Sequence, residues 1–170
     1  PFEDIMAVVV GRAITEDEEL SGPWIEYRRT GDRTFLQKAC GYGQKIPDTK
    51  LGAYYYSLVY QKQHYDVLLE VIARNGATFP LSKRCVMVDF GAGPGTAALA
   101  WADYVFHSTH ALPALSYVHV DQQSAMAPLC EALFAADKNL GDEFCWSSYR
   151  NTPTDAADAQ RWVANADYAI

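Results

Sequence analysis

Three glycines at alternate positions follow a short apolar run, and this feature limits the fold more than any other in the chain. The stretch VMVDFGAGPGT occupies positions 86 to 96, and an alanine-rich segment continues from it to position 106. The compact β-branched run predicts a buried strand, and the alanine-rich segment predicts a helix. Glycine between them allows the backbone to turn sharply and lets another group approach the main chain. The stretch therefore predicts a strand, a tight turn that faces a ligand, and a helix.

The alternation of strand and helix patterns continues to the end of the chain. SYVHVD and EFCWSSY predict strands, APLCEALFAADK and DAADAQRWVANA predict helices, and DYAI resembles the start of a fourth strand. Short connections between such elements are typical of parallel, right-handed crossover units. We therefore expect an α/β fold with a doubly wound, mainly parallel sheet over residues 81–170. Because the sequence ends within the fourth predicted strand, we expect this domain to be incomplete at its C-terminus.

Residues 1–80 predict a helical N-terminal segment. Asp48 or Thr49 can cap a helix whose apolar positions recur every three, four or seven residues, and Asn75 with Gly76 supplies its stop. The first 20 residues predict a short helix or strand. SGPWIEYRRTGD predicts a loop because it holds two glycines and a proline, and TFLQKAC predicts a short helix. The segment is expected to cover the ligand or to recognise a substrate.

Charge is distributed unevenly along the chain. The net charge is −7, but residues 24–62 hold seven basic and three acidic side chains, with eight aromatic residues interleaved among them. Basic groups beside stacking side chains suit RNA or another anionic partner, including a protein. The simpler interpretation, which we favour, is a solvated charged face beside an aromatic core stripe.

Composition also limits the location and the metal chemistry. No apolar run approaches the length of a membrane span, so we expect a cytoplasmic, soluble protein without a membrane partner. The four cysteines are widely spaced, which favours reduced thiols. His107 and His110 form an HxxH without a third ligand, so no metal site is predicted. His64 is expected on a polar helix face, His119 is expected to be packed or hydrogen-bonded, and Cys130 is expected in the core.

The glycine turn fits two nucleotide-type ligands unequally. A dinucleotide fingerprint needs a third glycine at the sixth position, where this chain has Thr96. The alternative pattern, acid-x-Gly-x-Gly-x-Gly, is complete in Asp89, Gly91, Gly93 and Gly95. A carboxylate repels a pyrophosphate but attracts an amino group or a sulfonium. The pattern therefore favours S-adenosylmethionine, with its carboxylate near the start of the following helix.

A second acid supports a nucleoside ligand. Asp121 ends the second predicted strand, where a carboxylate can accept both hydroxyls of a ribose. Gln122 follows it and is expected to border the adenine.

VMVDFGAGPGTAALAW followed by YVHVDQQSAM resembles the first two motifs of class I S-adenosylmethionine-dependent methyltransferases. The resemblance implies a Rossmann-like fold in which the three glycines line the methionine part of the cofactor, Asp89 lies near its amino group, and Asp121 holds the ribose. It also implies an adenine contact from Ser147 or Ser148. The full set of expected cofactor-binding residues is Asp89, Phe90, Gly91, Ala92, Gly93, Gly95, Thr96, Asp121, Gln122 and Ser147.

Two departures from this family matter. The 25 residues between Gly95 and Asp121 predict an insertion around HSTHALPALS. The family places its substrate-facing motif after the fourth strand, beyond the end of this sequence, so no catalytic residue is assigned. The DFGAGPGT motif is also weakly similar to that of methyltransferase-like proteins of small ribosomal subunit assembly. This similarity would suit an RNA acceptor.

Two other functions remain open from the sequence. One is an NAD(P)-dependent oxidoreductase, which Asp89 and Thr96 disfavour. The other is a catalytically inactive methyltransferase-like module that binds RNA or protein. The expected function is methyl transfer from S-adenosylmethionine to an RNA, protein or small-molecule acceptor.

Overall fold

The computed structural model describes residues 2–75, 84–112, 114–149, 160, 163–164 and 166–169. Its centre is a parallel sheet with the strand order β3-β2-β1-β4. The strands are β1 (Cys85–Phe90), β2 (Leu115–Val120), β3 (Cys145–Tyr149) and β4 (Tyr168–Ala169). The predicted α/β class and the positions of all four strands are confirmed. The helix predicted over residues 155–166 falls largely outside the described residues.

Strand β1 is central in the sheet. It pairs in parallel with β2 along its whole length, and Met87 and Val88 pair with β4 on its other edge. The chain therefore passes from β1 outward through β2 to β3, and β4 lies on the opposite side of β1. In parallel sheets a ligand crevice forms where the strand order reverses in this way, beyond the carboxyl ends of the strands.

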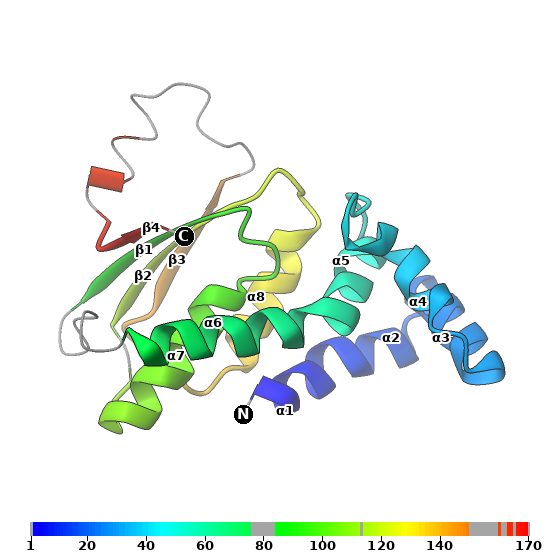
Figure 1. Cartoon of the computed structure of the whole chain (residues 1–170), viewed down its shortest axis with the longest axis horizontal. Helices are drawn as coiled ribbons and strands as arrows, with labels where there is room; N and C mark the ends of the chain where they lie inside the picture. The colour runs from blue at the N-terminus through cyan, green and yellow to red at the C-terminus, as the bar shows by residue number, and fades with distance from the viewer. Residues whose placement is uncertain are drawn as a thin grey trace.

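Helices α7 (Thr96–Thr109) and α8 (Met126–Ala136) connect the first three strands and cover one face of the sheet (Figure 1). Leu115 and Tyr117 of β2 point into this helical layer, and the Tyr117 ring meets the Phe134 ring of α8 edge-on at 5.6 Å. α7 is apolar on almost every side, and Trp101 within it is fully buried. A helix that is hydrophobic all round belongs in the core.

The insertion expected between α7 and β2 is absent. α7 continues through His107 to Thr109, so most of the extra length is helix, and a short connection leads to Leu115. The alanine-rich composition continues far enough to support four turns, and His110 ends the helix with a left-handed backbone (φ 55°).

The N-terminal segment is helical, as predicted. The first residues form a helix, not a strand, and the helix predicted from Thr49 to Asn75 is confirmed, with one π-helical turn in its middle. Thr49 caps it, since its hydroxyl accepts a hydrogen bond from the Gly52 amide at 3.1 Å. The elements are α1 (Phe2–Met6), η1 (Ala7–Gly11), α2 (Arg12–Glu16), α3 (Glu18–Thr30), α4 (Thr34–Ala39), η2 (Gly41–Gly43), α5 (Lys50–Tyr56), η3 (Ser57–Gln61) and α6 (Lys62–Arg74).

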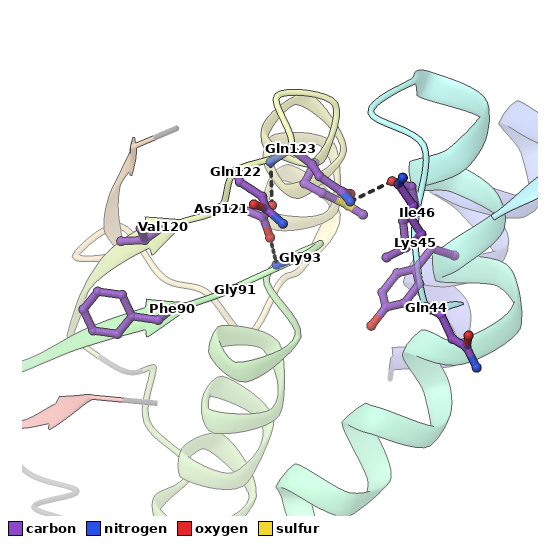
Figure 2. Close-up of a pocket in the computed structure, with 12 residues that line it drawn as sticks. Gln44, Lys45, Ile46, Phe90, Gly91, Gly93, Val120, Asp121, Gln122 and Gln123 are labelled. Carbon is purple, nitrogen blue, oxygen red and sulfur yellow. Dashed lines mark hydrogen bonds between the residues drawn. The ribbon is translucent and has the colours of Figure 1, made fainter. Parts of the chain in front are cut away.

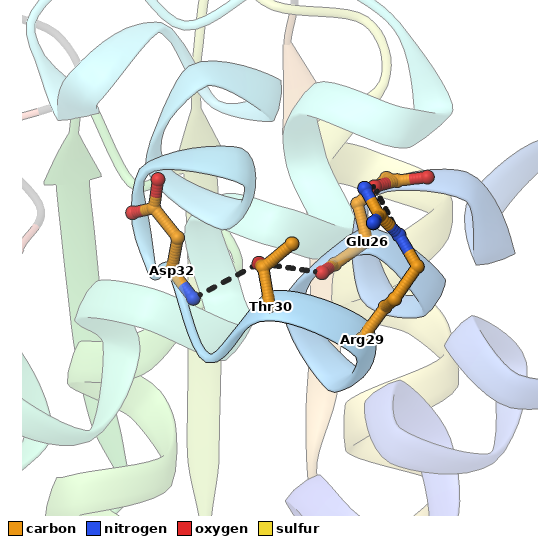
Figure 3. A network of polar contacts seen from close by, with 4 residues as sticks. All are labelled: Glu26, Arg29, Thr30 and Asp32. Atoms are coloured by element: carbon orange, nitrogen blue, oxygen red, sulfur yellow. Dashed lines mark hydrogen bonds and ion pairs between the residues drawn. The ribbon is translucent and has the colours of Figure 1, made fainter.

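The loop predicted over residues 21–32 is wrong, because most of that stretch lies in helix α3. Asp17 caps this helix by accepting from the Glu19 amide at 2.9 Å. Near its end, the Thr30 hydroxyl donates to the Glu26 carbonyl at 2.8 Å and accepts from the Asp32 amide at 3.1 Å (Figure 3). Pro23 removes one helical hydrogen bond, but the caps and the buried Leu20 outweigh this loss.

The helical segment and the sheet share one hydrophobic core. Phe2 of α1 stacks on Tyr65 of α6, with ring centroids 4.1 Å apart, and the Tyr65 hydroxyl donates to Asp103 of α7. Tyr55 is fully buried and its hydroxyl donates to the Leu20 carbonyl at 2.6 Å. These contacts join α6 to α1 and α7, and α5 to α3.

Candidate functional site

The turn between β1 and α7 is built from glycines in the left-handed region. The φ values are 69° at Gly91, 54° at Gly93 and 74° at Gly95. A side chain at Gly95 would meet Cys130 Sγ and Phe134 Cζ of α8, both at 2.6 Å, so this glycine serves packing. A side chain at Gly91 would meet nothing within 4 Å, and at Gly93 the nearest atom is a Tyr56 ring carbon at 3.8 Å. Gly91 therefore exposes its main chain to open space, whereas Gly93 is itself buried and borders the cavities described below.

Asp121 fixes the turn from the end of β2. Its Oδ2 accepts from the Gly93 amide at 2.8 Å, and its Oδ1 accepts from the Gln123 amide at 2.7 Å (Figure 2). A carboxylate has about four acceptor positions, so each oxygen can still accept a further hydrogen bond. The acid is thus held in one orientation and keeps capacity for a ligand.

A cavity of about 660 Å³ lies beside this acid. One wall is the glycine turn with the end of β2, and the other is the loop that carries Gln44, Lys45 and Ile46 (Figure 2). The two walls are tied together, because Gln123 Nε2 donates to the Ile46 carbonyl at 2.9 Å. The lining is Gln44, Lys45, Ile46, Tyr56, Phe90, Gly91, Gly93, Val120, Asp121, Gln122, Gln123 and Met126.

A second cavity of about 290 Å³ lies on the other side of the turn, between α6 and the start of α7. It shares Tyr56, Gly91 and Gly93 with the first cavity, so the two adjoin across the turn. Its lining is Tyr56, Gln63, His64, Val67, Leu68, Asp89, Gly91, Ala92, Gly93, Pro94, Thr96 and Ala97.

The second cavity contains both an acid and an imidazole. Asp89 is buried, its Oδ2 accepts from the Tyr117 hydroxyl at 2.5 Å, and burial raises the pKa of its carboxyl. His64 Nδ1 lies 3.0 Å from the Tyr56 hydroxyl. Burial raises the pKa of the Tyr56 phenol, so this group keeps its proton at neutral pH. Gly95 has no side chain with which to cap the first turn of α7, and Thr96 and Ala97 at the start of this helix line the second cavity. The first amides of a helix have no partner within the helix and suit a negatively charged group.

Most of the residues predicted from the sequence line these two cavities. Phe90, Asp121 and Gln122 line the first, Asp89, Ala92 and Thr96 line the second, and Gly91 and Gly93 line both.

Gly95 and Ser147 line neither cavity. Gly95 packs against α8 instead. Ser147 lies opposite Val118 in the sheet, whereas Ser148 lies opposite His119, so the two serines face opposite sides. The Ser148 hydroxyl is 3.0 Å from His119 Nδ1 and lines neither cavity. The adenine contact expected of these serines stays a prediction.

The sequence did not identify the cavity walls that come from the helical segment. Tyr56, Gln63 and His64 precede the glycine turn by some thirty residues and carry no motif. His64 lies on an exposed helix face, as expected, and that face also borders the second cavity. The helical spacing of positions 56 and 64 was the one available signal.

His119 and Cys130 meet their expectations. Both are buried, and His119 has hydrogen-bond contacts at both ring nitrogens. Within the described ranges, no group of three or more potential metal ligands comes together. His107 Nδ1 donates to the Asp103 carbonyl at 2.7 Å.

The basic aromatic segment 24–62 is used largely for folding. Tyr55 is fully buried, and Trp24, Tyr27, Tyr54 and Tyr60 are partly buried against the core. Arg29 pairs with Glu26 at 2.6 Å, and Lys50 pairs with Asp17. A macromolecular partner for this segment stays a prediction.

Comparisons with known proteins give no family assignment. No family model matches the chain, and a search of curated proteins found no match. Among the helices of the described residues, none has the length and apolar character that crossing a membrane requires.

Proposed function

We propose that this chain binds S-adenosylmethionine across Gly91 and Gly93 and serves as the cofactor domain of a methyltransferase. In this proposal the adenosine part occupies the larger cavity and the methionine part occupies the smaller one. The doubly wound, class I methyltransferase form of the α/β fold belongs to the same proposal.

One observation carries the proposal: two adjoining cavities of different chemistry share the glycine turn. The larger one offers a fixed carboxylate, Asp121, which suits ribose hydroxyls, beside Gln122 and the apolar Val120 and Met126. The smaller one offers the Asp89 carboxylate, the His64 imidazole and the start of α7 at Thr96 and Ala97. An acid beside an imidazole and a helix N-terminus is complementary to an α-amino acid, because the acid suits its ammonium and the hydrogen-bond donors suit its carboxylate.

The same arrangement argues against a dinucleotide. A pyrophosphate at the glycine turn would lie between Asp89 and Asp121, two acids within one site. Like charges at short distance repel, and Lys45 is the single Lys or Arg among the described residues that line the two cavities. A ligand with an ammonium and a sulfonium is compatible with both carboxylates.

The chain's own residues would act by positioning. Asp121 and Gly93 would hold the nucleoside, Asp89 the ammonium, and His64 with the α7 amides the carboxylate. When bound, S-adenosylmethionine would supply a methyl group to an acceptor lone pair, with the carbon–sulfur bond breaking so that the sulfonium leaves as a neutral thioether. Such a displacement depends mainly on alignment, and a base is needed only for an acceptor that loses a proton. We assign no catalytic residue.

Calorimetric titration of the chain with S-adenosylmethionine, S-adenosylhomocysteine, methylthioadenosine and NAD tests the proposal. We expect the three sulfur nucleosides to bind and NAD not to bind. Asp121→Ala should weaken all three by about 10- to 100-fold, since it removes a hydrogen bond to a charged group. His64→Gln should weaken the two ligands that carry an amino acid, by about 3- to 10-fold, and spare methylthioadenosine.

Matched controls keep these results specific. Asp142→Ala removes an exposed carboxylate that lines neither cavity, and His107→Gln removes an imidazole from the far end of α7. Both should bind as the parent chain does. Binding of NAD alone would favour an oxidoreductase. If none of the four ligands binds, the proposal of a cofactor site is rejected.

A further inference from the structure

His119 is a buried histidine at the carboxyl end of β2, and both of its ring nitrogens are engaged. It is 1% exposed. Nε2 lies 2.7 Å from the Gly93 carbonyl oxygen, and Nδ1 lies 3.0 Å from the Ser148 hydroxyl. A carbonyl oxygen can only accept, so Nε2 carries a proton and donates it to Gly93. In the neutral ring, Nδ1 then accepts from Ser148.

Gly93 is thereby held on both sides of its α-carbon. Asp121 accepts from its amide at 2.8 Å, and His119 donates to its carbonyl. The two side chains are two residues apart at the end of the same strand. The hydrogen bond to the Gly93 amide restrains φ, and the hydrogen bond to its carbonyl restrains ψ. Together the two hydrogen bonds select one backbone conformation of a residue that can otherwise adopt many.

The neighbouring strand orients the imidazole. Ser148 lies opposite His119 in the β2–β3 register, which brings its hydroxyl to Nδ1. The ring of Trp146, also on β3, meets the His119 ring edge-on at 6.2 Å. A hydrogen bond at one ring nitrogen determines which nitrogen carries the proton. The Gly93 carbonyl, which can only accept, sets the tautomer with the proton on Nε2, and the Ser148 hydroxyl then holds the ring orientation by donating to Nδ1.

We propose that His119, oriented by Ser148, is a positioning residue that sets the glycine turn for ligand binding. It acts through Gly93, which lines both cavities. Without the imidazole, the turn samples other backbone conformations, and a ligand must select the competent one at a cost in affinity. The effect of His119 on ligand affinity rests on the proposed function. The restraint that His119 places on the Gly93 backbone does not.

Two NMR measurements on the full chain test the hold on Gly93 directly. The ¹⁵N shifts of His119 should report a proton on Nε2. Hydrogen exchange of the Gly93 amide should be faster in His119→Ala than in the parent, by about 3- to 10-fold, the factor expected for one net hydrogen bond. Ser148→Ala should give a smaller increase, since the ring stays packed against Trp146.

Leu115→Ala separates this role from a general loss of stability. Leu115 is fully buried at the other end of β2, so its truncation loosens the same strand without touching Gly93. Leu115→Ala should lower the melting temperature. The ratio of the hydrogen-exchange rate of the Gly93 amide to that of the Val88 amide should stay the same as in the parent chain. An Nδ1 proton in the parent, or equal ratios in His119→Ala and Leu115→Ala, would overturn the proposal.

Calorimetry with S-adenosylhomocysteine tests the ligand half. His119→Ala should bind it about 3- to 10-fold more weakly than the parent, and His119→Gln, which keeps a donor, should recover part of the loss. Unchanged affinity in a variant with faster Gly93 exchange would refute the link to binding. If the parent itself does not bind, the proposed function fails while the NMR result still decides the hold on Gly93.

Discussion

At the scale of single residues, the three glycines of the turn are required for different physical reasons. All three have a positive φ, but a side chain would be blocked by neighbouring atoms only at Gly95, where the turn packs on Cys130 and Phe134. At Gly91 the space that a side chain would fill is open. Gly95 is therefore required for stability, whereas Gly91 leaves room for a ligand.

Gly95→Ala is predicted to lower the free energy of unfolding by about 2 to 4 kcal/mol, the sum of left-handed strain and overpacking against α8. Gly31→Ala is the matched control, because Gly31 has the same φ of 74° and no atom within 4 Å of an added Cβ. It should cost about 1 kcal/mol from strain alone. Urea denaturation of both variants measures the difference, and equal losses would contradict the packing argument.

The sequence predicted the residues of the turn because they are contiguous. Acid-x-Gly-x-Gly-x-Gly identified Asp89 and the three glycines, and the strand end identified Asp121. His64 and Tyr56 could not be found in this way, since they reach the turn only after α6 packs beside α7. Ser147 and Ser148 face opposite sides of β3 and neither lines a cavity, so the strand end alone was not enough to place this contact.

At the scale of elements, the N-terminus of α8 is capped from a distant part of the chain. No side chain of the helix caps it, but Asp48 Oδ1 accepts from the Ala125 amide at 2.9 Å, and its carboxylate accepts from the Ser124 hydroxyl at 3.1 Å. The sequence predicted Asp48 or Thr49 as a cap for the next helix. Thr49 has that role, and Asp48 instead joins the wall of the larger cavity to α8.

Asp48→Ala is predicted to lower the free energy of unfolding by about 1 to 2 kcal/mol, the value of a helix cap with a favourable charge at a helix N-terminus. Hydrogen exchange of the Ala125 amide should become faster. Thr49→Ala is the control. It removes the cap of α5 and should lower the free energy of unfolding by a similar amount, but it leaves Asp48 in place. Equal exchange of Ala125 in both variants would exclude the link between Asp48 and α8.

Helix α3 marks the limit of sequence-based prediction at this scale. Gly22 and Pro23 are local signals that predict a loop. The caps at both ends and the burial of Leu20 together stabilise the helix by more than Gly22 and Pro23 destabilise it. Leu20 contributes only because it is buried against elements far along the chain, which the local sequence does not reveal. The strands were easier to predict because each is a short run that contains valine or aromatic residues and is separated from the next by a helical pattern.

At the scale of the whole molecule, two buried carboxylates lie between the helical segment and the sheet. Asp103 on α7 accepts from Tyr65 and from Asn139. Asp137, just after α8, accepts from the Asn139 amide at 2.9 Å with Oδ1, while its Oδ2 has no hydrogen-bond partner among the described residues. Burial raises the pKa of Asp137 to about 6 from an ordinary value of 3.8.

This shift predicts that Asp137 destabilises the fold at neutral pH. Between pH 4 and 6 the native state binds more protons than the unfolded state, so the free energy of unfolding falls as pH rises through this window and stays lower above it. Asp137→Asn keeps the shape and removes the charge. It should raise the free energy of unfolding at pH 7.5 by about 2 kcal/mol and have little effect at pH 4.

Urea denaturation of the parent and of Asp137→Asn at pH 4, 5, 6 and 7.5 measures this difference. Other buried acids such as Asp89 also titrate, but their contributions are common to both proteins and cancel in the comparison. Asp142→Asn, which neutralises an exposed acid, should follow the parent at every pH. A gap between Asp137→Asn and the parent that is constant with pH would mean that the carboxylate charge is not the cause, whereas a gap that opens from pH 4 to 6 identifies it.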